Sequence, residues 1–161
     1  QALEEYPGNV NIIFLRARAK GQAGDLYGAI ADYDLILSSR LPDQTVFDIE
    51  TIKNNKAYCL FETGELNAAF NLVNEALKTN PPHDYIYHTR AEIYYTWGNY
   101  EKALSDLNKA LTYNPKSEAV LYLKGLIYLK QGKKNQGCKL LSEAGQYGYE
   151  KAYEQITENC Q

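Results

Sequence analysis

Three cysteines and two histidines are the residues of this 161-residue chain whose chemistry is most easily recognised. Cys59, Cys138 and Cys160 form no Cys-x-x-Cys pair, the spacing that protein zinc sites usually need. No Ser or Cys nucleophile with a base partner follows from the positions of His83 and His88. The sequence therefore predicts no catalytic residue, no metal site and no cofactor, and we expect the chain not to be an enzyme.

Composition narrows the classes of partner. The formal net charge is −3, which disfavours nucleic acid, because nucleic-acid binding relies on clustered Lys and Arg. No apolar run reaches the ~18 residues that a membrane-spanning helix needs, so we expect no membrane insertion by this segment. The 15 tyrosines suit half-buried helical seams and binding surfaces, because each apolar ring carries a polar tip.

An internal repeat indicates the elements that must position these residues. Four glycines stand 40, 34 and 34 residues apart, and each has one small residue seven positions before it and another five positions after it. Proline follows the second and third glycines by 17 residues. The glycines are Gly24, Gly64, Gly98 and Gly132, and the small residues are Ala17, Ala57, Ala91, Gly125, Ala29, Ala69, Ala103 and Gly137.

Each feature of this repeat has a mechanical reason. Two antiparallel helices about 8–10 Å apart need small residues where they cross. Glycine after the first helix takes the left-handed conformation that ends the helix at little cost. Proline after the second helix stops it and turns the chain into the next pair. The repeat therefore predicts consecutive helical hairpins, since an ordinary helical bundle would not repeat small residues at two fixed offsets four times.

This pattern resembles the tetratricopeptide repeat, a 34-residue helix–turn–helix with small, aromatic and proline positions in this order. The segment from Asp84 to Lys116 matches best and contains the run AEIYYTWGNYEKALSDLNKALTYNP. The resemblance implies an all-α fold, a right-handed α-α superhelix (solenoid) of helix-turn-helix repeats with a C-terminal capping helix. The fourth repeat departs from the pattern, because it has glycine at both small positions and lacks the proline.

The repeat also predicts how the chain is divided. One solenoid domain spans residues 1–161, with repeats over 10–49 (including an insertion), 50–83, 84–117 and 118–148, and a capping helix over 149–161. Residues 1–9 indicate the tail of a second helix, because Ala2 and Pro7 have the five-residue spacing that separates Ala110 from Pro115. We therefore expect at least one further repeat upstream.

Two of the cysteines fall on successive helices of this arrangement. Cys138 and Cys160 lie about ten and twelve residues on either side of the turn near Gly148, so antiparallel helices would place them nearly level. A disulfide between them would close a 23-residue loop and would imply an oxidising compartment. The alternative is two unpaired thiols. Cys59 lies in the middle of a predicted helix and is most simply a small buried or half-buried residue.

The resemblance implies that a partner binds on a concave surface lined by the first helix of each hairpin. The matching residues combine amides, which can pair with a peptide backbone, and tyrosine rings, which give contact area at low entropy cost. They are Asn11, Phe14, Arg18, Thr51, Asn54, Asn55, Tyr58, Tyr85, His88, Thr89, Glu92, Tyr95 and Tyr122. Packing against a neighbouring repeat is the alternative; we favour it for Leu123 and Leu126, and the groove for Asn54, Tyr85 and His88.

One known binding mode of the family, a clamp for a peptide carboxylate, can be checked against the residues of this chain. Some members grip the C-terminal carboxylate of heat-shock proteins with a clamp of Lys, Arg and Asn. Asn55 matches this clamp, but Tyr85 and Thr89 stand where the Lys and Arg belong. We therefore expect the carboxylate clamp to be absent.

The predicted function is a protein–protein interaction scaffold that binds a peptide or a helix of a partner protein on its concave face. Two alternatives stay open: a structural module that self-assembles into a homo-oligomer, and a regulatory arm of a larger protein. The stretch LLSEAGQYGYEKAYEQI resembles the short repeats that close some bacterial cell-envelope proteins. This resemblance favours the periplasm or cell envelope over the cytoplasm.

Overall fold

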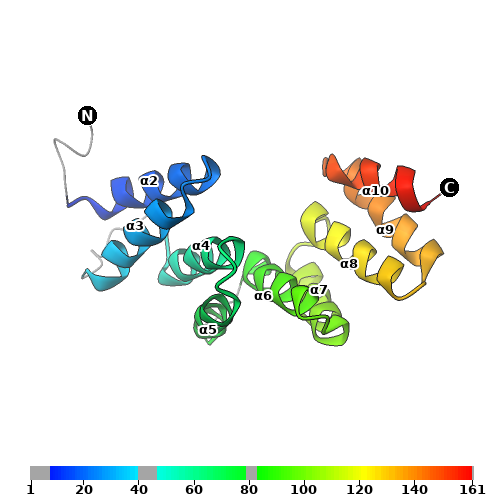
Figure 1. Cartoon of the computed structure of the whole chain (residues 1–161), viewed down its shortest axis with the longest axis horizontal. Coiled ribbons are helices and arrows are strands. Elements are labelled where there is room, and N and C mark those ends of the chain that lie inside the picture. The colour runs from blue at the N-terminus through cyan, green and yellow to red at the C-terminus, as the bar shows by residue number, and fades with distance from the viewer. Residues whose placement is uncertain (1–7, 40–46, 79–82, 161) are drawn as a thin grey trace. The chain divides into compact units, whose positions relative to one another are not determined.

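The computed structural model describes residues 8–39, 47–78 and 83–160, and within these ranges every regular element is an α-helix (Figure 1). The chain divides into two compact units, residues 1–82 and residues 83–161. Unit 1 contains α2 (Val10–Gln22), α3 (Leu26–Ser38), α4 (Ile49–Glu62) and α5 (Leu66–Ala76). Unit 2 contains α6 (Asp84–Thr96), α7 (Tyr100–Tyr113), α8 (Glu118–Lys130), α9 (Lys134–Gln146) and α10 (Lys151–Asn159). Most of the helix tail predicted over residues 1–9, and most of the insertion before residue 47, lie outside the described residues.

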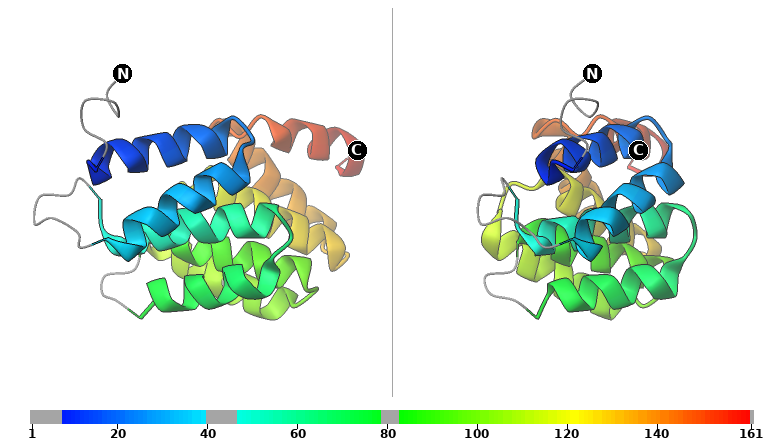
Figure 2. Two further views of the ribbon diagram at one scale, coloured as in Figure 1. Left: turned by 60° about the vertical axis from the view of Figure 1, so that its left-hand side comes forward. Right: turned by 90° about the vertical axis from the view of Figure 1, so that its left-hand side faces the viewer.

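Consecutive helices pack as hairpins inside each unit, and Figure 2 shows these hairpins from two further directions. In unit 1, α2 packs on α3 and α4 on α5, and in unit 2, α6 packs on α7 and α8 on α9. The last helix, α10, packs on α9. One apolar cluster of unit 2 joins α6, α7 and α8 around Ala91, Leu107 and Ile127, and a second joins α8, α9 and α10 around Leu121 and Ala144.

The turn inside each hairpin depends on glycine. Gly132, between α8 and α9, has a backbone φ of 73°, a conformation that other residues rarely adopt. This geometry lets the Lys133 amide donate back to the Tyr128 carbonyl over 2.8 Å, which satisfies a carbonyl at the end of α8. Gly24, Gly64 and Gly98 have the same left-handed backbone at the corresponding turns.

The small residues stand where paired helices come closest. A Cβ atom added at Gly137 of α9 would lie 2.9 Å from the Gly125 carbonyl oxygen of α8 and 2.9 Å from the Leu129 side chain. These distances are shorter than normal carbon contacts, and one of them is to backbone that cannot rotate away. The pair Gly125 and Gly137 therefore lets the two backbones approach more closely than alanine would permit.

We expect Gly137→Ala to lower the free energy of unfolding by about 1–3 kcal/mol, because the added methyl overpacks the α8–α9 crossing. Alanine is normally the better helix former by about 1 kcal/mol, so the packing cost must reverse the usual sign. Gly21→Ala is the matched control, because its added Cβ would meet only ordinary contacts at 3.7 and 3.8 Å. Urea unfolding of both variants checks this, and stabilisation by Gly137→Ala would contradict it.

An arginine–aspartate pair joins the two helices of the first hairpin in each unit. Arg90 of α6 donates to both carboxylate oxygens of Asp106 of α7, from Nε at 2.7 Å and from Nη2 at 2.8 Å. Arg16 and Asp32 make the same two-point contact between α2 and α3, at 2.7 and 2.6 Å. Burial alone would raise the pKa of Asp32, but the hydrogen bonds and charges of Arg16 and Lys20 hold it below its usual value.

The second hairpin of each unit replaces this pair with a lysine that reaches back to the first hairpin. Lys124 of α8 donates to Asn108 of α7 over 2.8 Å, and Lys56 of α4 pairs with Asp34 of α3. Leucine, Leu72 or Leu140, occupies the position of the buried aspartate. The two units therefore repeat one design, in which hairpins with an internal arginine–aspartate pair alternate with hairpins that have lysine and leucine at these two positions.

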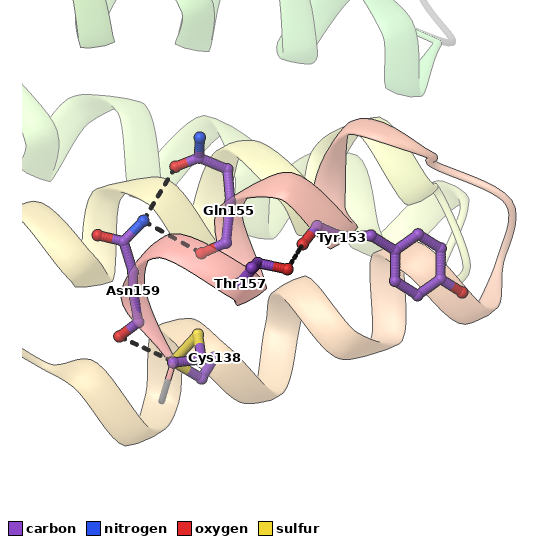
Figure 3. The surroundings of a disulfide bond; sticks show 6 residues. Cys138, Tyr153, Gln155, Thr157 and Asn159 are labelled. Carbon is purple, nitrogen blue, oxygen red and sulfur yellow. Dashed lines mark hydrogen bonds between the residues drawn. A yellow bond between two sulfur atoms is a disulfide. The ribbon is translucent and has the colours of Figure 1, made fainter.

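A disulfide bond between Cys138 and Cys160 joins α9 to the C-terminal end of α10, with Cα atoms 5.7 Å apart (Figure 3). Of the two states that the sequence left open, the structure contains the bonded one. Helix α10 buries only Ala152 among its own residues, and Tyr153 is 55% exposed. The disulfide therefore holds a helix that apolar packing alone secures weakly.

Candidate functional site

One stripe of α6 carries four of the predicted contact residues. Tyr85, His88, Glu92 and Tyr95 recur at the three- and four-residue steps that place side chains on one face of a helix. All four are half-buried, so each presents part of its side chain to solvent. Tyr85 also stacks on His83, the residue that precedes α6, with ring centroids 4.9 Å apart.

His88 is a neutral ring on this stripe at physiological pH. Burial lowers its pKa to about 4, and the opposing effects of a hydrogen bond with the Ala119 backbone and of the Asp84 charge do not offset this. Its Nδ1 atom lies 3.6 Å from Oε2 of Glu92, one turn further along α6. His88 therefore links α6 to the start of α8 and adds no positive charge to the surface near neutral pH.

Tyr122 of α8 extends the surface toward α10. Its ring packs against that of Tyr149, which precedes α10, with centroids 4.6 Å apart. Burial raises the pKa of Tyr122, and the charges of Glu154 and Glu158 raise it further. All four side chains are exposed or half-buried, so this part of unit 2 combines aromatic rings with accessible carboxylates.

Two further carboxylates raise the pKa of Tyr149. Burial has the largest effect on this pKa, and the neighbouring Tyr122 raises it further. The charges of Glu92 on α6 and Glu118 at the start of α8 also raise it. Tyr95 lies close enough to Tyr122 for that ring to affect its pKa as well. We call this surface the tyrosine–glutamate face; its members are Glu92, Tyr95, Glu118, Tyr122, Tyr149, Glu154 and Glu158.

Other tyrosines of unit 2 are covered by the chain's own cations. Lysine Nζ atoms lie 5.4–5.8 Å from the ring centroids of Tyr94, Tyr87, Tyr147 and Tyr128. Within the part of the chain that the structure describes, no lysine or arginine lies over Tyr95, Tyr122 or Tyr149. The aromatic rings of the tyrosine–glutamate face therefore lack the internal cation that their counterparts have.

In unit 1, the predicted contact residues are more mixed. Tyr58 of α4 and Arg18 of α2 are exposed, and Asn11 and Thr51 are half-buried. Asn55 is half-buried and hydrogen-bonds to Tyr33, whose pKa burial raises to about 12. The amide of Asn55 therefore helps to hold α4 against α3, and Tyr58 and Arg18 are the accessible groups of this face.

Three predicted contact residues are buried, and we correct their assignment. Phe14 lies in the core of unit 1, stacked on Phe47 with centroids 4.1 Å apart. Thr89 is buried, and its hydroxyl donates to the Tyr85 carbonyl of its own helix over 3.0 Å. Asn54 is only 5% exposed, and its Oδ1 atom accepts no hydrogen bond in the described structure. These positions pack against neighbouring helices, so their side chains do not offer a surface to a partner.

The sequence did not identify every residue of the tyrosine–glutamate face. Leu123 is buried, as the packing alternative predicted, and Leu126 is half-buried. Tyr149, Glu118, Glu154 and Glu158 were not among the predicted contacts. The four-residue spacing of Glu154 and Glu158 was a usable signal, since it places both on one side of the last helix.

The described residues contain no group of three or more His, Cys, Asp or Glu side chains that could hold a metal ion. Among them, no helix is long and apolar enough to cross a membrane.

Comparison with known proteins identifies the repeat. Residues 91–132 match the family model described as TPR repeat, where TPR stands for tetratricopeptide repeat. No curated protein sequence matches the chain significantly.

Three solved structures illustrate the similarity of fold. TTC0263, a thermophilic TPR protein in Thermus thermophilus, is 17% identical with a TM-score of 0.79, over 99% of this chain and 85% of that chain. MamA is 19% identical with a TM-score of 0.68, over 94% of this chain and 85% of that chain. The first TPR of Spaghetti (RPAP3), bound to the HSP90 peptide SRMEEVD, is 16% identical with a TM-score of 0.63, over 69% of this chain and 90% of that chain.

At these identities the solved structures show the fold. The prediction of an all-α solenoid of helix-turn-helix repeats is confirmed by the helical hairpins and by these structural neighbours. Residues 91–132 therefore match a tetratricopeptide repeat, and the chain has the helical repeat fold of tetratricopeptide repeat proteins.

Proposed function

We propose that this chain is a protein-interaction scaffold without catalytic activity of its own, and that it binds a peptide or helix of a partner protein. The observation that carries this proposal is the set of exposed or half-buried aromatic and polar side chains on the first helices of the hairpins, among them Tyr58, Tyr85 and Tyr95, while the buried small residues hold the hairpins together. Tyrosine at such positions provides large contact area with few rotatable bonds, a property typical of binding surfaces.

The structural neighbours support the same class of function. The first TPR of Spaghetti is bound to a peptide of HSP90, so a protein of this fold can hold a short segment of another protein. In this chain, Thr89 is buried and Tyr85 is aromatic at the two positions where a carboxylate clamp would need Arg and Lys. A peptide ligand of this chain would therefore be recognised by a different chemistry.

A peptide-display selection against the full chain tests the proposal. We expect selected peptides to lose about tenfold in affinity when Tyr58→Ala alters unit 1 or Tyr85→Ala alters unit 2, depending on which unit holds the peptide, because accessible tyrosines on a binding face are frequent hot spots. Tyr27→Ala is the matched control, because Tyr27 is 69% exposed but lies on α3, the second helix of its hairpin. Fluorescence anisotropy gives the affinities. Peptides that bind both variants as tightly as the unaltered chain would contradict the assignment of these faces.

A further inference from the structure

The tyrosine–glutamate face of unit 2 combines two features that attract positive charge. The charges of four glutamates, on α6, α8 and α10, raise the pKa of Tyr122 or Tyr149, and one of these glutamates, Glu118, lies one helical turn before Tyr122 on α8. These two rings are in contact with each other at 4.6 Å, so the aromatic surface is continuous between α8 and α10. A cation placed over such a surface would gain from the ring faces and from the carboxylates at once.

Several basic side chains of unit 2 are engaged away from this face. Lys102 and Lys109 lie over Tyr94 and Tyr87, and Arg90 is paired with Asp106. Lys124 donates to Asn108 of α7. His88, the one basic side chain on the α6 stripe of this surface, is neutral near physiological pH because burial lowers its pKa to about 4. These groups therefore do not neutralise the negative charge of the tyrosine–glutamate face.

We propose that the tyrosine–glutamate face of unit 2 binds a cationic segment of a partner protein, with Lys or Arg side chains seated over Tyr122 and Tyr149 and paired with the surrounding glutamates. This inference rests on the proposed scaffold function and adds the chemical class of the partner. Rings supply contact area and an attractive quadrupole, and exposed carboxylates speed the encounter with a basic segment. An acidic peptide would meet like charge on the same surface.

Three synthetic peptides of 12 residues test this preference on the full chain. They share one Gly/Ser/Ala framework and differ at four positions, which carry Lys, Gln or Glu. We expect the Lys peptide to bind at least tenfold more tightly than the Gln peptide, and the Glu peptide to bind most weakly. Isothermal titration calorimetry at low and moderate salt gives the affinities, and the preference for Lys should decrease with salt because Glu118, Glu154 and Glu158 are exposed.

Paired variants place the binding on this face. We expect Glu154→Gln with Glu158→Gln to weaken binding of the Lys peptide about fivefold, since each exposed ion pair makes a modest contribution. Tyr122→Leu should weaken it by a similar factor by removing the aromatic surface. The matched control is Glu101→Gln with Glu143→Gln, which removes the same charge from the outer helices α7 and α9 and should change affinity less than twofold.

Each contrary result has a distinct meaning. Equal affinity for the Lys and Gln peptides, with loss of binding in Tyr58→Ala or Tyr85→Ala, would leave the scaffold function standing and overturn the preference for cations. An equal effect of the two double-glutamate variants would overturn the placement on this face. If none of the three peptides bound, while peptides from the display selection did, the cationic preference would again fail. Failure of both peptide sets would overturn the scaffold function as well.

Discussion

Replacing Asp106 with asparagine should lower the free energy of unfolding by about 3 kcal/mol. Asp106 is buried, and both of its oxygens accept hydrogen bonds from Arg90, whose side chain is only 18% exposed. Asparagine keeps the size of the side chain but removes its charge, so the guanidinium loses its counter-charge in a place that water reaches poorly. Breaking one partner of a buried ion pair is costly for this reason.

The corresponding change in unit 1 should cost less. Asp32 is buried like Asp106, but its partners Arg16 and Lys20 are 38% and 31% exposed. Both cations can turn toward solvent when the carboxylate is neutralised, so Asp32→Asn should lower the free energy of unfolding by about 1 kcal/mol. Equal losses in the two variants would show that burial of the arginine does not set the size of the effect.

The second hairpins of the chain supply the rescue variant. They carry Lys56 with Leu72, and Lys124 with Leu140, at the positions that Arg90 and Asp106 occupy. Arg90→Lys with Asp106→Leu should therefore recover most of the stability that Asp106→Asn loses, because leucine packs and lysine reaches solvent. Urea unfolding followed by far-ultraviolet circular dichroism, which reports on the helices of both units, measures these effects. Fluorescence of Trp97, the single tryptophan, reports in addition on unit 2, where it lies.

Loss of the disulfide should release α10 and lower the stability of unit 2 by about 3 kcal/mol in the chain-entropy description, given the 22-residue separation of the two cysteines. Only Ala152 of α10 is buried, so little apolar packing replaces the covalent bond. We expect Cys160→Ser, or reduction of the unaltered protein, to abolish hydrogen-exchange protection of residues 151–159. Amides of α6 and α7 should keep their protection, because their apolar cluster and the Arg90–Asp106 pair are untouched.

Thiol chemistry provides the control for this result. The unfolded protein without reductant should show one reactive thiol, from Cys59, which is free and buried in the folded chain. Burial raises the pKa of the Cys59 thiol, so it should react slowly before unfolding. Three reactive thiols in the unreduced protein would contradict the disulfide, and unchanged exchange of α10 after reduction would contradict its role in holding this helix.

The sequence by itself determined the helical hairpins. Gly132 and its counterparts mark turns that need a left-handed backbone, and Gly125 and Gly137 mark a crossing too close for a side chain. Both requirements act on the backbone within one hairpin, so they appear as residue types at fixed spacings and can be recognised without coordinates.

Only the tertiary structure decided which of the first-helix residues reach solvent. Phe14, Asn54 and Thr89 lie on first helices, as Tyr58 and Tyr95 do, but they are buried in the folded chain. Likewise, Tyr122 meets Tyr149, and glutamates of three helices raise the pKa of these two tyrosines, only because the fold brings α6, α8 and α10 together in unit 2. Spacing along one helix fixes which residues share a face, but contacts between helices decide what that face contains.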